Sequence, residues 1–168
     1  MKHLVTGGAG FIGSALVKKL VEQGHEVVVI DDHSSSGGEL LNENSLKSSV
    51  KTVCGNISYI KTQTGLHKKL LDAFEGVDTV FHLAAKARVQ PSIKEPVHFN
   101  ATNVEGTLNM LEYSRKAKVR RFVFTSSSSI YGNTEIIPTS EDTPPNPLSP
   151  YGLQKLIGEQ YCQLYSRI

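Results

Sequence analysis

A glycine-rich turn, TGGAGFIG, follows the first apolar segment of the chain and precedes a segment of helical periodicity. Gly8, Gly10 and Gly13 fit the spacing G-x-G-x-x-G, and Gly7, Gly10 and Gly13 fit the wider G-x-x-G-x-x-G. Glycines at such a turn let the backbone reverse tightly, let a pyrophosphate approach the helix N-terminus, and let the helix pack closely on the strand. A glycine cluster alone is more often an ordinary turn, but the flanking strand and helix favour a dinucleotide-binding unit.

Short apolar segments alternate with longer helical segments along the whole chain. β-branched and aromatic residues indicate strands at 2–6, 26–30, 50–53, 79–83 and 121–126. Apolar residues at three- and four-residue spacing indicate helices at 11–23, 66–74, 103–116 and 151–167. This order predicts an α/β fold, a Rossmann-type doubly wound parallel sheet with helices on both faces. The loops 31–49 and 132–150, the second of them rich in proline, are expected to contain no regular helix.

Length, charge and cysteine content exclude several classes of protein. The 168 residues suit one domain, 1–168, and the 18 basic and 16 acidic residues form no basic block that would bind nucleic acid. The start MKHLVTGGAG is unlike a signal peptide, and no apolar run approaches the length of a membrane span. Cys54 and Cys162 are interpreted as reduced, buried thiols rather than a disulfide or part of a metal site. We expect a cytoplasmic protein that binds no metal, nucleic acid or membrane.

Asp31 ends the second expected strand, VVVIDD, 21 residues after Gly10. A dinucleotide-binding fold has a carboxylate there that accepts hydrogen bonds from the adenosine ribose hydroxyls. The alternative is a solvated acid at a strand end. The ribose interpretation predicts NAD rather than NADP, because a carboxylate repels a 2′-phosphate.

Two further motifs follow the last expected strand. YGLQK contains Tyr151 and Lys155 four residues apart, which brings both side chains to one face of a helix. Such a pair is usually an ordinary helix surface, and the serine run of FTSSSSIYG could be a flexible linker. Beside a dinucleotide fingerprint they have a chemical use, since a lysine ammonium favours the phenolate form of a tyrosine that acts as a base.

These motifs together, with HLAA at 82–85 and N-V-x-G-T at 103–107, resemble those of the extended short-chain dehydrogenase/reductases. Within them the chain is similar to the NAD-dependent epimerase/dehydratase family, most of all to its UDP-glucose (UDP-galactose) 4-epimerases. The likeness covers the whole chain. It implies an isomerase that uses NAD as cofactor, acts on a UDP-sugar substrate and forms a homodimer. The apolar positions of the helices at 103–116 and 151–167 would build the interface between subunits.

The resemblance also implies a set of site residues. The catalytic residues would be Ser127, four residues before Tyr131, together with Tyr151 and Lys155. Asn103 would brace the catalytic segment, and His82 of HLAA is interpreted as a packed strand residue. The implied cofactor-binding residues are Gly7, Gly10, Phe11, Ile12, Gly13, Asp31, Asp32, Ser36, Asn56, Ile57, Leu83, Ala84, Ala85, Asn103, Tyr151 and Lys155.

The chain departs from the family pattern in two respects. Asn56 stands where the family usually has an aspartate, so one acceptor for the adenine amine loses its charge. The chain ends at Ile168, only 13 residues after Lys155, whereas family members continue into a smaller C-terminal domain that binds the nucleotide sugar. We therefore expect a truncated cofactor-binding domain that binds NAD and lacks epimerase activity on its own.

The reaction is expected to be reversible oxidation at C4 of the sugar. Related dehydratases and decarboxylases carry carboxylates just after the catalytic hydroxyl, where this chain has Ser128 and Ser129. Two alternatives stay open. One is another nucleotide-sugar enzyme, such as a UDP-glucuronate 4-epimerase or a dehydratase, and the other is an NAD-binding module without catalytic activity.

Overall fold

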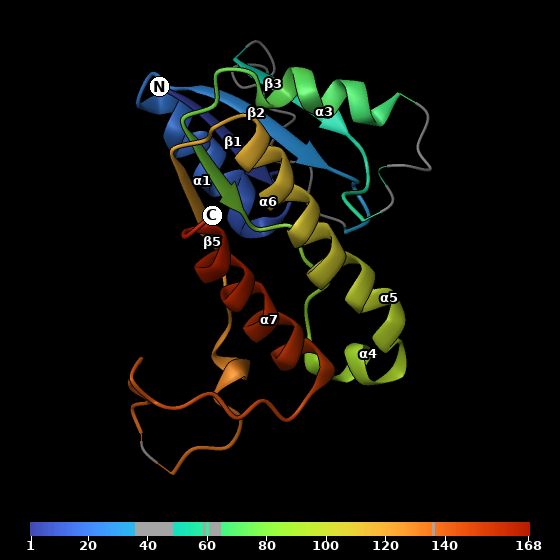
Figure 1. The fold of residues 1–168 in the computed structure, drawn as a ribbon, viewed down its shortest axis with the longest axis vertical. Coiled ribbons are helices and arrows are strands. Elements are labelled where there is room, and N and C mark those ends of the chain that lie inside the picture. The colour runs from blue at the N-terminus through green and yellow to red at the C-terminus, as the bar shows by residue number, and fades with distance from the viewer. Residues whose placement is uncertain (36–48, 59, 61–64, 136) are drawn as a thin grey trace.

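The computed structural model describes residues 1–35, 49–58, 60, 65–135 and 137–168, and these residues contain one five-stranded parallel sheet. Its strand order is β3-β2-β1-β4-β5 (Figure 1). The strands are β1 (Lys2–Thr6), β2 (Glu26–Asp31), β3 (Val50–Cys54), β4 (Thr79–His82) and β5 (Arg121–Phe124). The chain moves outward from β1 through β2 to β3 and then returns to the other side of β1, so the predicted doubly wound parallel sheet is confirmed.

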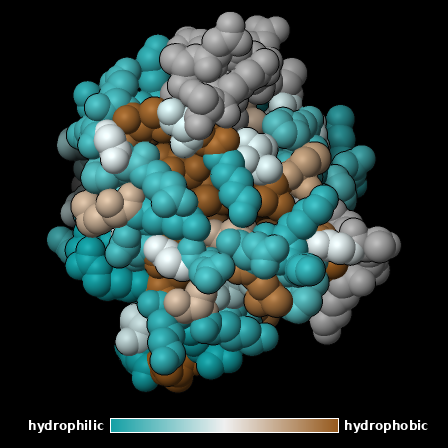
Figure 2. All heavy atoms as spheres, turned by 90° about the horizontal axis from the view of Figure 1, so that it is seen from above, coloured by the Kyte–Doolittle hydropathy of each residue, from teal (hydrophilic) through white to brown (hydrophobic). Residues whose placement is uncertain are grey.

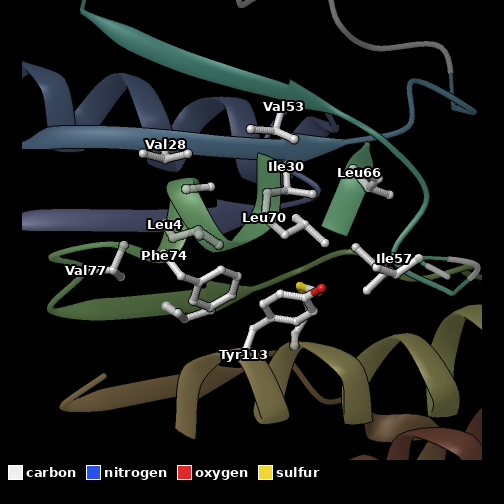
Figure 3. Close-up of a cluster of buried hydrophobic side chains, with 14 residues drawn as sticks. Leu4, Val28, Ile30, Val53, Ile57, Leu66, Leu70, Phe74, Val77 and Tyr113 are labelled. Carbon is white, nitrogen blue, oxygen red and sulfur yellow. The ribbon is translucent and has the colours of Figure 1, made fainter. Parts of the chain in front are cut away.

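The central strands are apolar on both faces because helices cover both. On one face, Leu4 and Val28 join Phe74 of α3 (Leu66–Phe74) in a buried cluster, which also contacts α6 (Thr107–Lys116) through Tyr113 (Figure 3). On the other face, Val5 packs with Val17 of α1 (Phe11–Glu22). Neighbouring residues of one strand therefore support different helices, which is why these strands carry no polar alternation.

The segment between β4 and β5 contains more helix than the sequence indicated. Two short helices, α4 (Val89–Lys94) and α5 (Pro96–Asn100), run into a π-helical segment, η3 (Ala101–Gly106), before α6 begins. The expected helix at 103–116 is thus π-helical over its first turn. Prolines at 91 and 96 obscured the two short helices, although proline at the first position of α5 is compatible with a helix start.

The C-terminal helix, α7 (Pro150–Tyr165), begins where the proline-rich loop ends. Ser149 caps it by accepting a hydrogen bond from the N–H of Gly152 at 3.0 Å. Further along, an added Cβ at Gly158 would lie 2.4 Å from Cζ of Phe124, so only glycine allows α7 to pack this closely on β5. The described part of the loop 132–150 holds no helix before Pro150, as expected.

Within the ranges that the structure describes, no helix combines the length and apolar character needed to cross a bilayer. Seen from above, hydrophilic residues cover most of the surface, and hydrophobic ones lie in small patches between them (Figure 2). Both cysteines, Cys54 and Cys162, are free thiols. The expected burial is wrong for Cys54, which is exposed because it ends the edge strand β3, and Cys162 is half-buried.

Candidate cofactor and catalytic site

A pocket lies at the carboxyl ends of β1, β2 and β4, where the strand order reverses about β1. Ligands of doubly wound sheets bind at this kind of switch point. Many of the residues expected at a cofactor line it, and Ser34, Ser35, Lys86 and Thr102 join them. The predicted residues in its lining are Gly7, Gly10, Asp31, Asp32, Asn56, Ile57, Leu83, Ala84 and Ala85.

The other predicted residues lie elsewhere. Phe11, Ile12 and Gly13 form the first turn of α1, beside the pocket. Ser36 lies outside the described residues. Asn103, Ser127, Tyr151 and Lys155 do not line this pocket and belong to η3, to the loop after β5 and to α7.

The glycine turn brings the N-terminus of α1 to the edge of the sheet. The N–H of Gly7 donates to the carbonyl of Ile30 at 2.8 Å, and an added Cβ at Gly7 would lie 2.7 Å from the backbone nitrogen of Ala84. Gly7 also has a φ of 70°, which side-chain-bearing residues rarely adopt. A side chain here would therefore displace both the turn and the strand end that faces it.

The first turn of α1 is open for an anion. Its residues are all described, and among them no side chain caps the helix N-terminus and none is acidic. Phe11 and Ile12 are 88% and 63% exposed. Uncapped N–H groups and the positive end of the helix dipole suit a pyrophosphate.

Asp31 joins the glycine turn to the end of β2. It is 9% exposed, and its Oδ2 accepts a hydrogen bond from the N–H of Ala9 at 2.9 Å while Oδ1 accepts from the N–H of His33 at 2.8 Å. The carboxylate therefore supports the turn as well as lining the pocket. These two hydrogen bonds were not expected from the sequence, because a position at a strand end does not show which backbone N–H groups will lie next to the side chain.

His82 lies in the middle of a series of hydrogen bonds that runs from Ala84 to Asn103. The N–H of Ala84 donates to Oγ1 of Thr6 at 3.2 Å, and Thr6 Oγ1 lies 2.7 Å from His82 Nδ1. On the other side, His82 Nε2 lies 3.0 Å from Oγ1 of Thr107, whose hydroxyl donates to the carbonyl of Asn103 at 2.7 Å. Since the Thr107 proton is used there, Nε2 of His82 carries its proton and Nδ1 accepts from Thr6.

The pKa of His82 agrees with this neutral state. Burial, and secondarily the charge of Lys155, lower it from the ordinary value of 6.5 to about 3. At 1% exposure the ring has no access to a substrate. His82 is thus a packed structural residue, as the sequence suggested, and not an acid or base near neutral pH.

Asn103 links the loop after β4 to α7. Its Oδ1 accepts from the N–H of Lys86 at 2.8 Å, and its Nδ2 donates to the carbonyl of Lys86 at 3.0 Å and to Oε1 of Gln154 at 2.9 Å. Gln154 precedes Lys155, so the amide of Asn103 is tied directly to the helix that bears the expected catalytic pair. Asn103 lies in a π-helical segment, a feature often found at functional sites.

Lys155 is buried at the contact between α7 and the end of β5. It is 4% exposed, and its Nζ donates to the carbonyl of Thr125 at 2.8 Å and lies 4.9 Å from the centre of the Phe124 ring. Burial lowers its pKa from 10.5 to about 8. The ammonium group therefore holds the segment that leads into the serine run.

Ser127 and Tyr151 lie at the N-terminal ends of two helices, η4 (Ser128–Ile130) and α7. Ser127 caps the 3-10 helix η4, because its Oγ accepts from the N–H of Ser129 at 3.2 Å. The N–H of Tyr151 donates to Oγ of Ser92 at 3.1 Å. Neither Ser92 nor Gln154 was expected at the site. Gln154 could have been suspected from its place inside YGLQK, but only the tertiary fold brings Ser92 to α7.

Comparison with known proteins gives consistent results. The sequence model of the NAD dependent epimerase/dehydratase family matches residues 3–167. A putative UDP-glucose 4-epimerase of Methanocaldococcus jannaschii is 40% identical over 166 residues, covering 98% of this chain and 51% of that protein. The crystal structure of a Thermotoga maritima UDP-glucose 4-epimerase with UDP-glucose superposes with a TM-score of 0.87 at 38% identity, over 99% of this chain and 52% of that one.

A second solved structure, MoeE5 in complex with UDP-glucose and NAD, has a TM-score of 0.82 at 35% identity. It is matched over 100% of this chain and 50% of its own. The chain thus spans about half the length of the relatives that it matches.

Proposed function

The chain belongs to the NAD-dependent epimerase/dehydratase family, and on that premise we propose that it forms the cofactor-binding portion of a UDP-glucose/UDP-galactose-type 4-epimerase. The observation that carries the proposal is a shared edge of the sheet. The pocket follows β1, β2 and β4, and Ser127 follows β5, the strand next to β4. The bound cofactor and the Ser127 hydroxyl would therefore lie at the same edge of the sheet.

NAD is the cofactor of this family, and the residues of the pocket fit it in three respects. The uncapped N-terminus of α1 offers N–H donors for a pyrophosphate. Asp31 and Asp32 offer acceptors for ribose hydroxyls, while Gly7 keeps the floor of the pocket free of side chains. When bound, NAD supplies the acceptor for the hydride at C4 of the sugar.

In the proposed mechanism the chain's own residues move and hold one proton. Tyr151 takes the proton of the sugar 4-hydroxyl and later returns it, and Ser127 donates a hydrogen bond to the same oxygen. Lys155, one helical turn after Tyr151, supplies the positive charge of the catalytic pair. If the 4-keto sugar rotates so that its other face is presented before the proton and the hydride return, the product is the C4 epimer.

The residues after Ser127 favour epimerisation over elimination. Ser128 and Ser129 form the turn of η4 and carry no carboxylate that could remove a group from the sugar. UDP-glucose and UDP-galactose are the substrates proposed here, with UDP-glucuronate as the alternative. Because its proposed substrates are soluble nucleotide sugars, we expect the enzyme to be cytoplasmic.

One observation favours a second candidate function. The 168 residues span about half the length of the relatives that they match, and we propose that, taken by themselves, they form an NAD-binding module without catalysis. Much of the positioning of a nucleotide sugar comes from contacts to its nucleotide, remote from the reacting carbon.

We also propose a homodimer. A groove between α5 and α7 is lined mostly by apolar residues, and of these Val97, Leu148 and Leu153 are exposed. Burying them against the same groove of a second copy would form a two-fold interface. The groove includes the helix at 151–167 that the sequence indicated, but α5 takes the place of the helix at 103–116.

The test of the proposed function combines binding and activity. Calorimetric titration of the 168-residue chain should show NAD binding at least about tenfold tighter than NADP binding, a difference of about 1.4 kcal/mol. A coupled assay with UDP-galactose should show no turnover by this chain. Failure to bind either cofactor would overturn both candidate functions, and turnover by the short chain would overturn the second.

A further inference from the structure

Two adjacent carboxylates, the last residue of β2 and the residue after it, line the pocket, but their hydrogen-bond partners differ. Asp31 is buried, and both of its oxygens accept backbone N–H groups. Asp32 is half-buried, and its Oδ1 accepts from the N–H of Ser34 at 3.0 Å. Asp32 is therefore the more accessible of the two charges.

The second oxygen of Asp32 is held by a side chain from the neighbouring strand end. Nδ2 of Asn56 donates to Oδ2 of Asp32 at 2.9 Å. The same amide accepts, through its Oδ1, a hydrogen bond from the N–H of Ser58 at 2.9 Å. Since only the amide oxygen can accept that bond, the NH₂ group is directed at Asp32.

An aspartate at position 56 could not make this contact. It would accept the bond from Ser58 equally well, but its other oxygen would face the carboxylate of Asp32 at hydrogen-bond distance. Two like charges so close repel each other, and the half-exposed Asp32 would turn toward water. The uncharged amide of Asn56 is thus matched to a carboxylate at position 32.

We propose that Asn56 is a positioning residue for cofactor selectivity, which holds Asp32 in the pocket so that two carboxylates, rather than Asp31 alone, oppose a phosphate on the adenosine ribose. The inference rests on the proposed NAD site. In this inference the negative charge that repels the phosphate is carried by Asp32, and Asn56 fixes where that charge lies.

The test is a double-mutant cycle read as the ratio of the dissociation constants of NADP and NAD, measured by calorimetry on the 168-residue chain. Asp32→Asn removes a charge, and its ratio is expected to fall at least about fivefold. Asn56→Ala removes no charge, yet its ratio is expected to fall by a similar factor because Asp32 is released. In the Asp32→Asn background, Asn56→Ala should have no further effect, since Asn56 acts through Asp32.

A matched control separates this role from support of the loop. Nδ2 of Asn109 donates to the carbonyl of Ile57 at 2.8 Å and so holds the same loop without lining the pocket. Asn109→Ala should leave the ratio unchanged. A general loosening of the loop would weaken the binding of both cofactors equally and leave the ratio of their dissociation constants unchanged. An unchanged ratio in Asn56→Ala therefore overturns the inference. A fall of the ratio in Asn109→Ala as large as that in Asn56→Ala overturns it as well. Absence of NAD binding by the unaltered chain would instead overturn the proposed function.

Discussion

Nζ of Lys155 donates a hydrogen bond to the carbonyl oxygen of Thr125 at 2.8 Å, and this bond joins α7 to the chain two residues before Ser127. The sequence predicted Lys155 as a partner of Tyr151 and of the cofactor. In the structure the buried ammonium also fixes the path of the serine segment. One side chain thus connects the residues proposed as hydroxyl donor and base.

Lys155→Met is expected to stabilise the chain at pH 7. The pKa of Lys155 is lowered to about 8, below its ordinary 10.5, so between these values the unfolded chain binds more protons than the folded one. Burial of the charged form therefore costs stability below pH 8, and that cost disappears above 10.5. Removing the buried charge removes that cost, and loss of the hydrogen bond to Thr125 offsets part of the benefit. The free energy of unfolding at pH 7 should therefore rise by roughly 1–2 kcal/mol. Urea unfolding at pH 7 and at pH 10 measures it, and a variant less stable than the original at pH 7 would contradict this account.

Acid should destabilise the chain through His82. Its pKa is about 3 in the folded chain against an ordinary 6.5, so the unfolded state takes up the proton first as the pH falls. Stability is full above pH 6.5 and declines below it by up to about 1.4 kcal/mol per pH unit from this group. His82→Gln should remove about 2 kcal/mol of the difference between pH 6.5 and pH 5. Equal pH dependence in the two proteins would mean that the pKa of His82 is not lowered in the folded chain.

Gly158→Ala should loosen the contact between α7 and β5. The new Cβ would lie 2.4 Å from the Phe124 ring, so the helix or the ring must move, at a cost of about 1–3 kcal/mol. Gln163→Ala, at an exposed position of the same helix, is the control and should be nearly neutral. Chemical denaturation compares the two variants. Equal stability would show that the close approach of α7 is not required.

Self-association is expected at tens of micromolar. Leu153→Glu introduces a charge into the apolar groove between α5 and α7 and should convert a dimer to a monomer without unfolding it, because Leu153 is exposed. Light scattering gives the mass of both proteins. A monomeric unaltered chain would rule out the proposed interface in this chain.

Much of the framework could be predicted because it depends on local pattern. The helix at 66–74 was predicted with its observed bounds, and the strands to within two residues, since buried apolar runs end where the chain reaches the sheet edge. The π-helical first turn at Asn103 carries no such pattern. The hydrogen bonds that link Thr6, His82 and Thr107 could not be predicted from the sequence either, because these residues belong to three segments that only the fold brings together.

Tyr151 is the proposed base of an NAD-dependent 4-epimerase, of which this chain is proposed to form the cofactor-binding portion. The most direct test is a coupled assay with UDP-galactose on the gene product at its full length, beside its Tyr151→Phe variant, with NAD binding measured on both. We predict turnover by the unaltered protein, a loss of at least about 100-fold in kcat for Tyr151→Phe, and NAD bound by both. A Tyr151→Phe variant as active as the original would contradict the claim.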